Sequence, residues 1–336
     1  MAKGNGLHPN PALAALAGAR ALVTGGAGAI GCNLVRQLLE LGAEVVVIDD
    51  FSSGRRANIV DLDGEFRLLQ GDVADVDLLD RAFADGVDFV FHLAALFANQ
   101  NSVEHPQDDL HTNGLGTLRL LEKASAQQVG RFVFASSSCV YGGRSEMLEE
   151  DLPAVPDTPY GITKVLGEQY ARFFAHQHGL PTAVLRYFNS YGPGELPGRY
   201  RNVIPNFFAL AAAGEPLPIT GTGEETRDFT YVDDIVRGTL LAAVVKGAEG
   251  GVYNLGTGAE TRIVDLAERI NAIAGNDAGI ELVPRRDWDQ IPRRCASIDR
   301  ARSELEYRPG VGFDEGLGRY WQWYITTQEK ISALRD

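Results

Sequence analysis

The sequence predicts an α/β protein built on a doubly wound parallel sheet, and two observations support this fold class. From residue 20 onward, short continuous apolar runs rich in β-branched residues alternate with longer segments of helical period. Strands that are apolar on both faces are typical of a parallel sheet with helices on its two sides. A glycine-rich turn also follows the first apolar run directly, where the sequence then becomes helical.

The expected elements follow one another in a regular order. Predicted strands occupy residues 19–25, 43–50, 65–73, 87–95, 131–138 and 182–194, the last of them ending in a loop. Predicted helices occupy residues 31–42, about 75–85, about 108–128 and 157–178. The last helix is entered through Thr158 and Pro159, because proline suits the first turn of a helix.

The change in sequence pattern indicates two domains. Residues 1–185 are expected to form the nucleotide-binding domain, with residues 1–18 as an N-terminal extension. Residues 186–336 are expected to form a smaller, C-terminal, substrate-binding α/β lobe, because Pro and Gly become frequent there and the alternation weakens. Strand and helix signals reappear at about 228–258, so we expect this segment to return to the first domain.

Composition narrows the class of protein. The formal net charge of −14 argues against nucleic-acid and anionic-membrane partners, which need an excess of Lys and Arg. The three cysteines are scattered without a CxxC pair, so we expect no disulfide framework and no metal site. No run approaches the roughly 18 apolar residues of a membrane span, and the N-terminus is too weakly apolar for a secretory signal. We therefore expect a cytoplasmic protein.

The turn TGGAGAIG indicates a Rossmann dinucleotide site. Gly25, Gly28 and Gly31 stand between a strand and a helix, where they allow a tight turn, close approach of a pyrophosphate and close helix packing. Asp49 ends the second strand, where its carboxylate can bind the adenosine ribose and repel a 2′-phosphate. This favours NAD. Arg55 and Arg56 leave NADP open as an alternative, although we prefer to interpret them as solvated loop charges.

The cofactor site is expected to extend along the ends of the successive strands. Asp72, after the third strand, is a candidate for the adenine edge, with an ordinary helix cap as the alternative. The complete set of predicted cofactor-binding residues is Gly25, Gly28, Ala29, Ile30, Gly31, Asp49, Asp50, Ser53, Gly54, Asp72, Val73, Leu93, Ala94, Ala95, Tyr160 and Lys164.

Three residues form a candidate catalytic group. Tyr160 and Lys164 are one helical turn apart and therefore share a face of the predicted helix. A free phenol, with a pKa of about 10, is a poor base, but a neighbouring ammonium and an oxidised nicotinamide favour the phenolate. Ser137 lies at the carboxyl end of a predicted parallel strand, where ligands bind in such sheets, and can hydrogen-bond the same substrate oxygen.

The motifs TGGAGAIG, HLAA, SSSCVYG, YGITK, RYFNSYGPG and RDFTYVDD occur in this order. In this the chain resembles the extended short-chain dehydrogenase/reductases, and among them the nucleotide-sugar epimerases of the UDP-glucose 4-epimerase type. The resemblance implies bound NAD, a UDP- or dTDP-sugar substrate, and a homodimer formed by the helices near 108–128 and 157–178. It also implies a catalytic triad of Ser137, Tyr160 and Lys164 and substrate-binding residues Ser137, Ser138, Asn189, Arg227 and Arg286.

The leading hypothesis is an isomerase, a nucleotide-sugar 4-epimerase that acts through a transient 4-keto sugar. Sugar 4,6-dehydratases resemble the chain but carry Asp and Glu where it has Ser138 and Cys139, so dehydration is disfavoured. Three other departures from the family pattern are Ala29, where an aromatic residue is usual, Gly161 and Ile162, where small residues such as Ala are usual, and the apolar Leu96, Phe97 and Ala98. The last three predict an unusually apolar pocket. A decarboxylase, a reductase and a non-catalytic cofactor-binding regulator stay open as alternatives.

Overall fold

The computed structural model describes residues 10–60, 62–97, 99–285 and 291–333 of the chain, and its centre is one parallel sheet. Seven strands follow the order β11-β6-β5-β4-β1-β2-β3, and every neighbouring pair is parallel. They are β1 (Arg20–Thr24), β2 (Glu44–Asp49), β3 (Phe66–Gln70), β4 (Phe89–His92), β5 (Arg131–Ser137), β6 (Thr182–Tyr187) and β11 (Gly251–Leu255). The strand order reverses between β1 and β4, which is where open α/β sheets bind ligands. The predicted fold class is confirmed.

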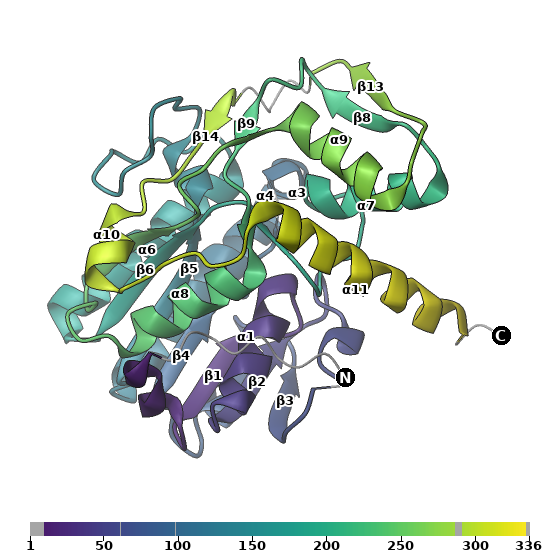
Figure 1. Cartoon of the computed structure of the whole chain (residues 1–336). Coiled ribbons are helices and arrows are strands. Elements are labelled where there is room, and N and C mark those ends of the chain that lie inside the picture. The colour runs from purple at the N-terminus through teal and green to yellow at the C-terminus, as the bar shows by residue number, and fades with distance from the viewer. Residues whose placement is uncertain (1–9, 61, 98, 286–290, 334–336) are drawn as a thin grey trace.

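Helices cover both faces of this sheet (Figure 1). α1 (Ala29–Glu40) packs with α8 (Val232–Val244) on one face, and α2 (Val76–Ala82), α5 (Thr117–Ala126) and α6 (Pro159–His178) cover the other. Consecutive residues of β5 show how the pleat divides them, because Val133 joins the core under α8 whereas Phe132 and Phe134 join the core under α5 and α6.

Shorter elements connect the main ones. The described short elements are η1 (Pro11–Leu16), η2 (Arg56–Asn58), α3 (Asn99–Glu104), α4 (Pro106–Asp109), η3 (Leu110–Gly116), η4 (Ser138–Tyr141) and α10 (Asp299–Glu304). The helix expected near 108–128 is therefore made of three consecutive segments, of which η3 is a π-helical turn. Such turns inside helices are frequent at functional sites.

The second lobe lies beyond the carboxyl ends of the strands (Figure 1). It contains α7 (Val203–Ala213), α9 (Ile263–Ala274), α11 (Phe313–Ala333) and the parallel pair β8 (Leu217–Thr220) and β13 (Ile280–Val283). A small sheet joins β12 (Thr261–Arg262), β9 (Thr226–Arg227) and β14 (Arg293–Arg294), and β7 (Ser190–Tyr191) pairs with β10 (Thr230–Tyr231). The chain leaves this lobe through α8, which packs on the large sheet, and β11, which is an edge strand of that sheet.

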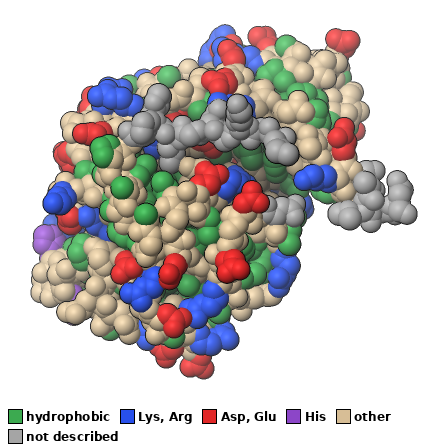
Figure 2. Space-filling view, turned by 60° about the horizontal axis from the view of Figure 1, so that its bottom comes forward, with side chains coloured by type: hydrophobic (Ala, Val, Ile, Leu, Met, Phe, Trp, Pro, Cys, Tyr) green, Lys and Arg blue, Asp and Glu red, His purple; other side chains and the backbone are tan. Residues whose placement is uncertain are grey.

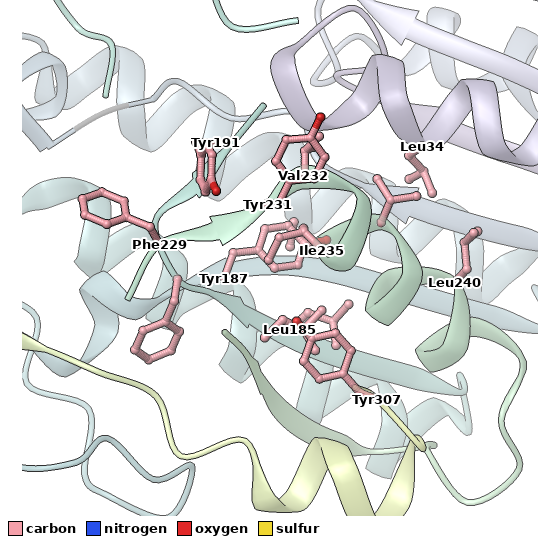
Figure 3. Close-up of a cluster of buried hydrophobic side chains, with 14 of the residues drawn as sticks. Leu34, Leu185, Tyr187, Tyr191, Phe229, Tyr231, Val232, Ile235, Leu240 and Tyr307 are labelled. Atoms are coloured by element: carbon pink, nitrogen blue, oxygen red, sulfur yellow. The ribbon is translucent and has the colours of Figure 1, made fainter. Parts of the chain in front are cut away.

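One hydrophobic core connects the two lobes. Figure 3 shows Leu34 of α1 and Leu185 of β6 in the same cluster as Tyr191 and Phe229, which come from the segments leading into the second lobe. The cluster continues to Phe208 of α7 without a break. Because close-packed protein interiors have low compressibility, the shared core holds the walls of the space between the lobes in a fixed relation.

The surface carries both signs of charge. In the view of Figure 2, Lys and Arg side chains are interspersed with Asp and Glu and do not gather into one basic patch. Among the helices of the described residues, none combines the length and the hydropathy needed to cross a membrane.

Candidate active site

A cavity of about 530 Å³ opens at the carboxyl ends of the strands, between the sheet and the second lobe. It is lined from the glycine-rich turn, through the end of β5 and the start of α6, to residues of β8 and β9. Every site residue that the sequence analysis assigned to cofactor, catalysis or substrate lies on its wall, except Arg286, which falls outside the described residues. The cavity therefore brings the three groups of residues together.

The glycine-rich turn has the geometry that a pyrophosphate requires. Gly25 has a φ of 71°, and a Cβ on Gly31 would lie 2.1 Å from the Gly25 carbonyl oxygen, so both positions need glycine. Gly28 is the N-cap of α1 and has no side chain that could accept from the backbone N–H groups of the first helical turn. These donors and the positive end of the helix dipole face the cavity, where phosphate oxygens would satisfy them.

Asp49 is positioned to receive the adenosine ribose. Its carboxylate, 6% exposed, accepts hydrogen bonds from the backbone N–H groups of Ala27 and Phe51, each at 2.8 Å. Burial raises the pKa of this carboxyl group. The guanidinium of Arg56 lies over the Phe51 ring and bonds Gln70, and neither Arg55 nor Arg56 lines the cavity. The two arginines are thus not placed to receive a 2′-phosphate, which fits NAD.

Asp72 lies on the cavity wall and is not the cap of the following helix. One of its oxygens accepts from the Ala74 N–H at 2.8 Å, and the other lies 2.8 Å from Nε2 of His111. The N-cap of α2 is Asp75, whose side chain accepts from the backbone of the first helical turn. The alternative interpretation of Asp72 as a helix cap is therefore wrong.

A buried neutral histidine fixes the end of β4. His92 lies 2.7 Å from the Thr24 hydroxyl and 2.8 Å from the Thr117 hydroxyl, one on each ring nitrogen. Burial lowers the pKa of His92 to about 3, so the ring is uncharged at neutral pH. The Thr24 hydroxyl also accepts from the Ala94 N–H at 3.2 Å. This chain of contacts holds the loop 93–95 against the cofactor site.

The catalytic candidates come from β5 and α6. Ser137 ends β5, and its hydroxyl accepts from the Cys139 N–H at 3.2 Å. α6 begins at Pro159 because Thr158 caps it by accepting from the Gly161 N–H. Lys164 donates from Nζ to the Ala135 carbonyl at 2.8 Å, and its Nζ lies 5.5 Å from the centre of the Tyr160 ring.

The electrostatics of these residues differ from the simple expectation. Burial raises the pKa of the Tyr160 phenol, although the Ser137 hydroxyl opposes this, and burial lowers the pKa of Lys164 to about 8. Lys164 therefore still carries a positive charge at pH 7, but that charge does not overcome the desolvation of Tyr160. A further positive charge beside the phenol is needed to make it a base, and oxidised NAD carries one.

Two sets of buried polar contacts hold α6 in position, and no sequence motif indicated either set. The first set centres on Asp109. Asp109 accepts from the Thr163 hydroxyl at 2.6 Å and from the Asn113 amide at 2.8 Å, and Asn113 accepts from the Leu96 N–H at 2.7 Å. Asn113 belongs to the π-helical turn η3, which this contact joins to the loop after β4. Phe97 of that loop packs edge-on against the Tyr160 ring, as the predicted apolar pocket requires.

The second set centres on a buried ion pair. Arg186 of β6 donates to both oxygens of Glu168 on α6, at 2.9 Å and 2.7 Å, and Ser136 donates to the same carboxylate at 2.5 Å. Glu168 and Arg186 are 6% and 6% exposed. The pair ties β6 to the helix that carries Tyr160, and the Ser136 hydroxyl adds β5, the strand that carries Ser137, to the same group.

The loop after β6 is fastened to the glycine-rich turn. The Asn33 amide donates to the carbonyls of Ala29 and Pro193, both at 2.8 Å. The Asn58 amide donates to the carbonyls of Ala27, at 2.9 Å, and Gly194, at 3.0 Å. These four hydrogen bonds, which we call the loop clasp, connect residues 193–194 with the two sides of the turn.

The substrate side of the cavity contains unsatisfied polar groups and several arginines. Asn189 Oδ1 and Ser190 Oγ are buried without a hydrogen-bond partner, and both residues line the cavity. Such atoms cost free energy unless a ligand bonds them. The arginines on this wall are Arg199, Arg201, Arg227, Arg285 and Arg294. Sequence reasoning named Arg227 individually. Arg285 and Arg294 belong to the run RRDWDQIPRR (residues 285–294), which the sequence offers as a diphosphate-binding patch, with a solvated charge run as the alternative.

A family model described as the NAD dependent epimerase/dehydratase family matches residues 21–256. The chain belongs to the NAD-dependent epimerase/dehydratase family. Its members modify nucleotide sugars, and this chain is an NAD-dependent nucleotide-sugar modifying enzyme of the extended short-chain dehydrogenase/reductase type. The predicted cofactor, NAD, is thereby confirmed.

Similar proteins show how the family assignment extends over the chain. The chain is 47% identical to an epimerase of Methanothermobacter thermautotrophicus, with a TM-score of 0.93 and coverage of 96% of this chain and 97% of that one. It is 35% identical to a UDP-glucose 4-epimerase of Thermotoga maritima solved with UDP-glucose, with a TM-score of 0.88 and coverage of 92% and 99%. A putative UDP-glucose 4-epimerase of Methanocaldococcus jannaschii is 34% identical, over 90% of this chain and 97% of that protein.

Relatives with other activities have similar identities. They include a UDP-N-acetyl-alpha-D-glucosaminuronate decarboxylase of Bacillus cytotoxicus, 32% identical, and a dTDP-glucose 4,6-dehydratase of Streptomyces niveus, 35% identical. The alignments cover 91% of this chain in both cases, and 97% and 92% of these relatives. Overall similarity therefore does not separate epimerase, dehydratase and decarboxylase.

Proposed function

We propose that the protein is an NAD-dependent nucleotide-sugar 4-epimerase. The observation that carries this proposal is the position of the Ser137 and Tyr160 hydroxyls. Both residues lie on the wall of one cavity that runs from the glycine-rich turn to the second lobe, close enough for the Ser137 hydroxyl to oppose the rise in the pKa of the Tyr160 phenol. A sugar held at this point by its nucleotide has its ring next to both hydroxyls and to the cofactor site.

Each residue has a distinct role in this proposal. Tyr160 accepts the proton of the sugar 4-hydroxyl and later returns it, and Ser137 hydrogen-bonds the same oxygen. Lys164, anchored to the Ala135 carbonyl, keeps an ammonium beside the phenol and reaches the nicotinamide ribose. When bound, NAD supplies the acceptor and donor of the hydride at C4, so that inversion proceeds through a 4-keto sugar without net oxidation.

The residues beside Ser137 favour epimerisation over dehydration. Ser138 and Cys139 line the cavity at the positions where the dehydratases carry Asp and Glu. Neither a hydroxyl nor a thiol is an acid of comparable strength at neutral pH. Elimination of water from the keto sugar therefore lacks a proton donor at this place.

We propose a UDP- or dTDP-sugar as the substrate. Arg227 and Asn189 line the cavity on its second-lobe side. The Asn189 amide oxygen and the Ser190 hydroxyl have no hydrogen-bond partner in the protein, which fits a hydrogen-bonding ligand there. Arginine suits a diphosphate because its fork of donors matches two phosphate oxygens.

We also propose a homodimer in which α6 and η3 of two copies pack together. Ile162 and Phe173, which lie on one face of α6, are 56% and 50% exposed, and Leu110 of η3 is 54% exposed. Large apolar side chains gathered on adjacent helices favour an interface over contact with water.

The proposed reaction is tested by the mass of the product. The purified protein is incubated with UDP- and dTDP-linked hexoses and hexuronates, and the nucleotide sugars are separated and weighed by mass spectrometry. An epimerase yields an isomer of unchanged mass, whereas loss of water or of carbon dioxide would assign the chain to the other activities. Absence of any conversion and of any NADH absorbance would favour a non-catalytic binding protein.

The roles of the residues are tested by Tyr160→Phe. We expect this variant to lose about 10²-fold or more of the turnover rate, because proton transfer to the phenol is lost. Its content of bound NAD should not change, because the phenolic oxygen is not part of the phosphate turn. Turnover equal to that of the wild type would refute the assignment of Tyr160 as the base.

A further inference from the structure

Arg294 on β14 is a buried cation on the cavity wall. Its side chain is 5% exposed and lies within 3.6 Å of Cys139 Sγ, and it donates to the Gly142 carbonyl at 3.0 Å. Its Nε is buried without a hydrogen-bond partner. Among the described residues, no carboxylate forms an ion pair with Arg294, whereas Arg285 on the same wall pairs with Glu225.

The physical chemistry of such a group points to an anionic ligand. A guanidinium taken out of water without a counter-charge raises the free energy of the folded chain. A carbonyl and a thiol satisfy part of its hydrogen bonding, but neither supplies a negative charge. An anion arriving in the cavity would supply the missing negative charge.

The contacts of Arg294 place it near the catalytic hydroxyls. It touches Cys139, whose backbone N–H donates to Ser137 Oγ at 3.2 Å, and Ser137 lies with Tyr160 on the wall of the same cavity. In the proposed reaction, C4 of the sugar lies at Tyr160. The diphosphate is attached to C1, at the opposite end of a pyranose ring, so an anion beside the C4 end must belong to a substituent of the ring itself.

A second arginine leaves Arg294 available for such a substituent. β9 and β14 pair in parallel with Arg227 opposite Arg294, so the two side chains lie next to each other on the wall. Two adjacent cations suit two separate anionic groups of one substrate. In the proposed function Arg227 takes the diphosphate.

We propose that Arg294 binds a carboxylate on the sugar ring, so that the preferred substrates are nucleotide-linked uronic acids. The carboxylate carbon is C6, attached to C5, the neighbour of the reacting C4. This inference rests on the proposed function, because that function places C4 at Tyr160. A neutral hexose leaves Arg294 without a counter-charge and binds less tightly.

Binding measurements test this proposal without turnover. The full chain, loaded with NAD and carrying Tyr160→Phe, is titrated by calorimetry with UDP, UDP-glucose and UDP-glucuronate, or with the dTDP series if only that series binds. We expect the uronate to bind at least about tenfold more tightly than the neutral sugar. On this background, Arg294→Gln should remove that preference while changing the affinity for the free nucleotide by less than about threefold.

Two further variants make the result specific. Arg294→Lys keeps the charge and should retain part of the preference, which also covers the case in which Arg294→Gln does not fold. Arg293→Gln is the matched control, because Arg293 is the neighbouring residue of β14 but bonds Glu260, at 2.8 and 2.7 Å, and does not line the cavity. It should leave the preference intact.

Three outcomes would overturn the proposal. In the first, the protein with Arg294 intact binds UDP-glucose and UDP-glucuronate equally. In the second, Arg294→Gln weakens the binding of UDP, UDP-glucose and UDP-glucuronate by one common factor, which would assign Arg294 to the diphosphate. The preference could also be lost equally in Arg293→Gln. Failure of the proposed 4-epimerase is seen separately, as a product of changed mass or as no product with Tyr160 intact, and does not alter these affinities.

Discussion

The buried ammonium of Lys164 makes the stability of the folded chain depend on pH in a defined way. Burial lowers its pKa from 10.5 to about 8. Between these values the unfolded chain holds a proton that the folded chain has released, so the free energy of unfolding rises with pH. Integration from about pH 7 to about pH 9.5 gives a gain of about 2 kcal/mol from this one residue.

The test compares the wild type with Lys164→Met, which has no titrating group at this position. Urea denaturation of the NAD-free proteins at the two pH values gives the difference in the free energy of unfolding between them. We expect this difference to change by about 2 kcal/mol in favour of the wild type as the pH rises. Lys246→Met, a change at an exposed lysine, controls for the loss of one lysine.

A difference that stays constant within about 0.5 kcal/mol would refute the reasoning. It would mean that Lys164 is as well solvated or as well paired in the folded chain as in water. The claim that the phenol needs a positive charge beyond that of Lys164 would then lose its basis.

Three other substitutions test the framework of the site. Gly31→Ala puts a Cβ 2.1 Å from the Gly25 carbonyl oxygen, so we expect loss of bound NAD and a lower melting temperature; unchanged NAD content after gel filtration would contradict this. Thr158→Ala removes the N-cap of α6 and should lower the free energy of unfolding by about 1 kcal/mol in urea, with Thr158→Ser close to the wild type. Glu168→Gln leaves Arg186 buried without its counter-charge and should cost about 3–5 kcal/mol by the same assay; a loss under about 1 kcal/mol would show that the pair is not needed.

The large sheet and the start of α6 could be predicted because their signals are local. Buried parallel strands are continuous apolar runs, and β5 and β6 are buried along nearly their whole length. Thr158 and Pro159 mark the first turn of α6 by chemistry that acts within three residues. The glycine-rich turn is recognisable for the same reason, since its three glycines lie within residues 25–31.

The polar contacts of the second lobe could not be predicted because they depend on distant segments. β9 and β14 have two residues each, and the pairing of Arg227 with Arg294 joins parts of the chain more than sixty positions apart. A strand of two residues has no periodicity to recognise. The same is true of Glu168 with Arg186, where a carboxylate on an amphipathic helix would ordinarily be expected in water.

The expectation for Tyr160 shows a different limit. Spacing on a helix correctly brings Lys164 near the phenol, but it does not measure how much water the fold removes from either group. Burial acts on both residues against their charged forms. The balance between attraction and desolvation depends on all the residues of the pocket, so the spacing of two residues in the sequence does not determine it.

The loop clasp bears on how long one NAD molecule stays bound to the protein. Asn33 and Asn58 bind residues 193–194 to the turn that receives the pyrophosphate, so we expect these hydrogen bonds to stabilise the turn with the dinucleotide bound. In the proposed 4-epimerase the hydride returns to the sugar, so the cofactor does not have to be exchanged between cycles. We therefore expect one molecule of NAD to stay bound through many catalytic cycles. The turnover rate of the NAD-loaded protein should then be the same with and without added NAD in the buffer.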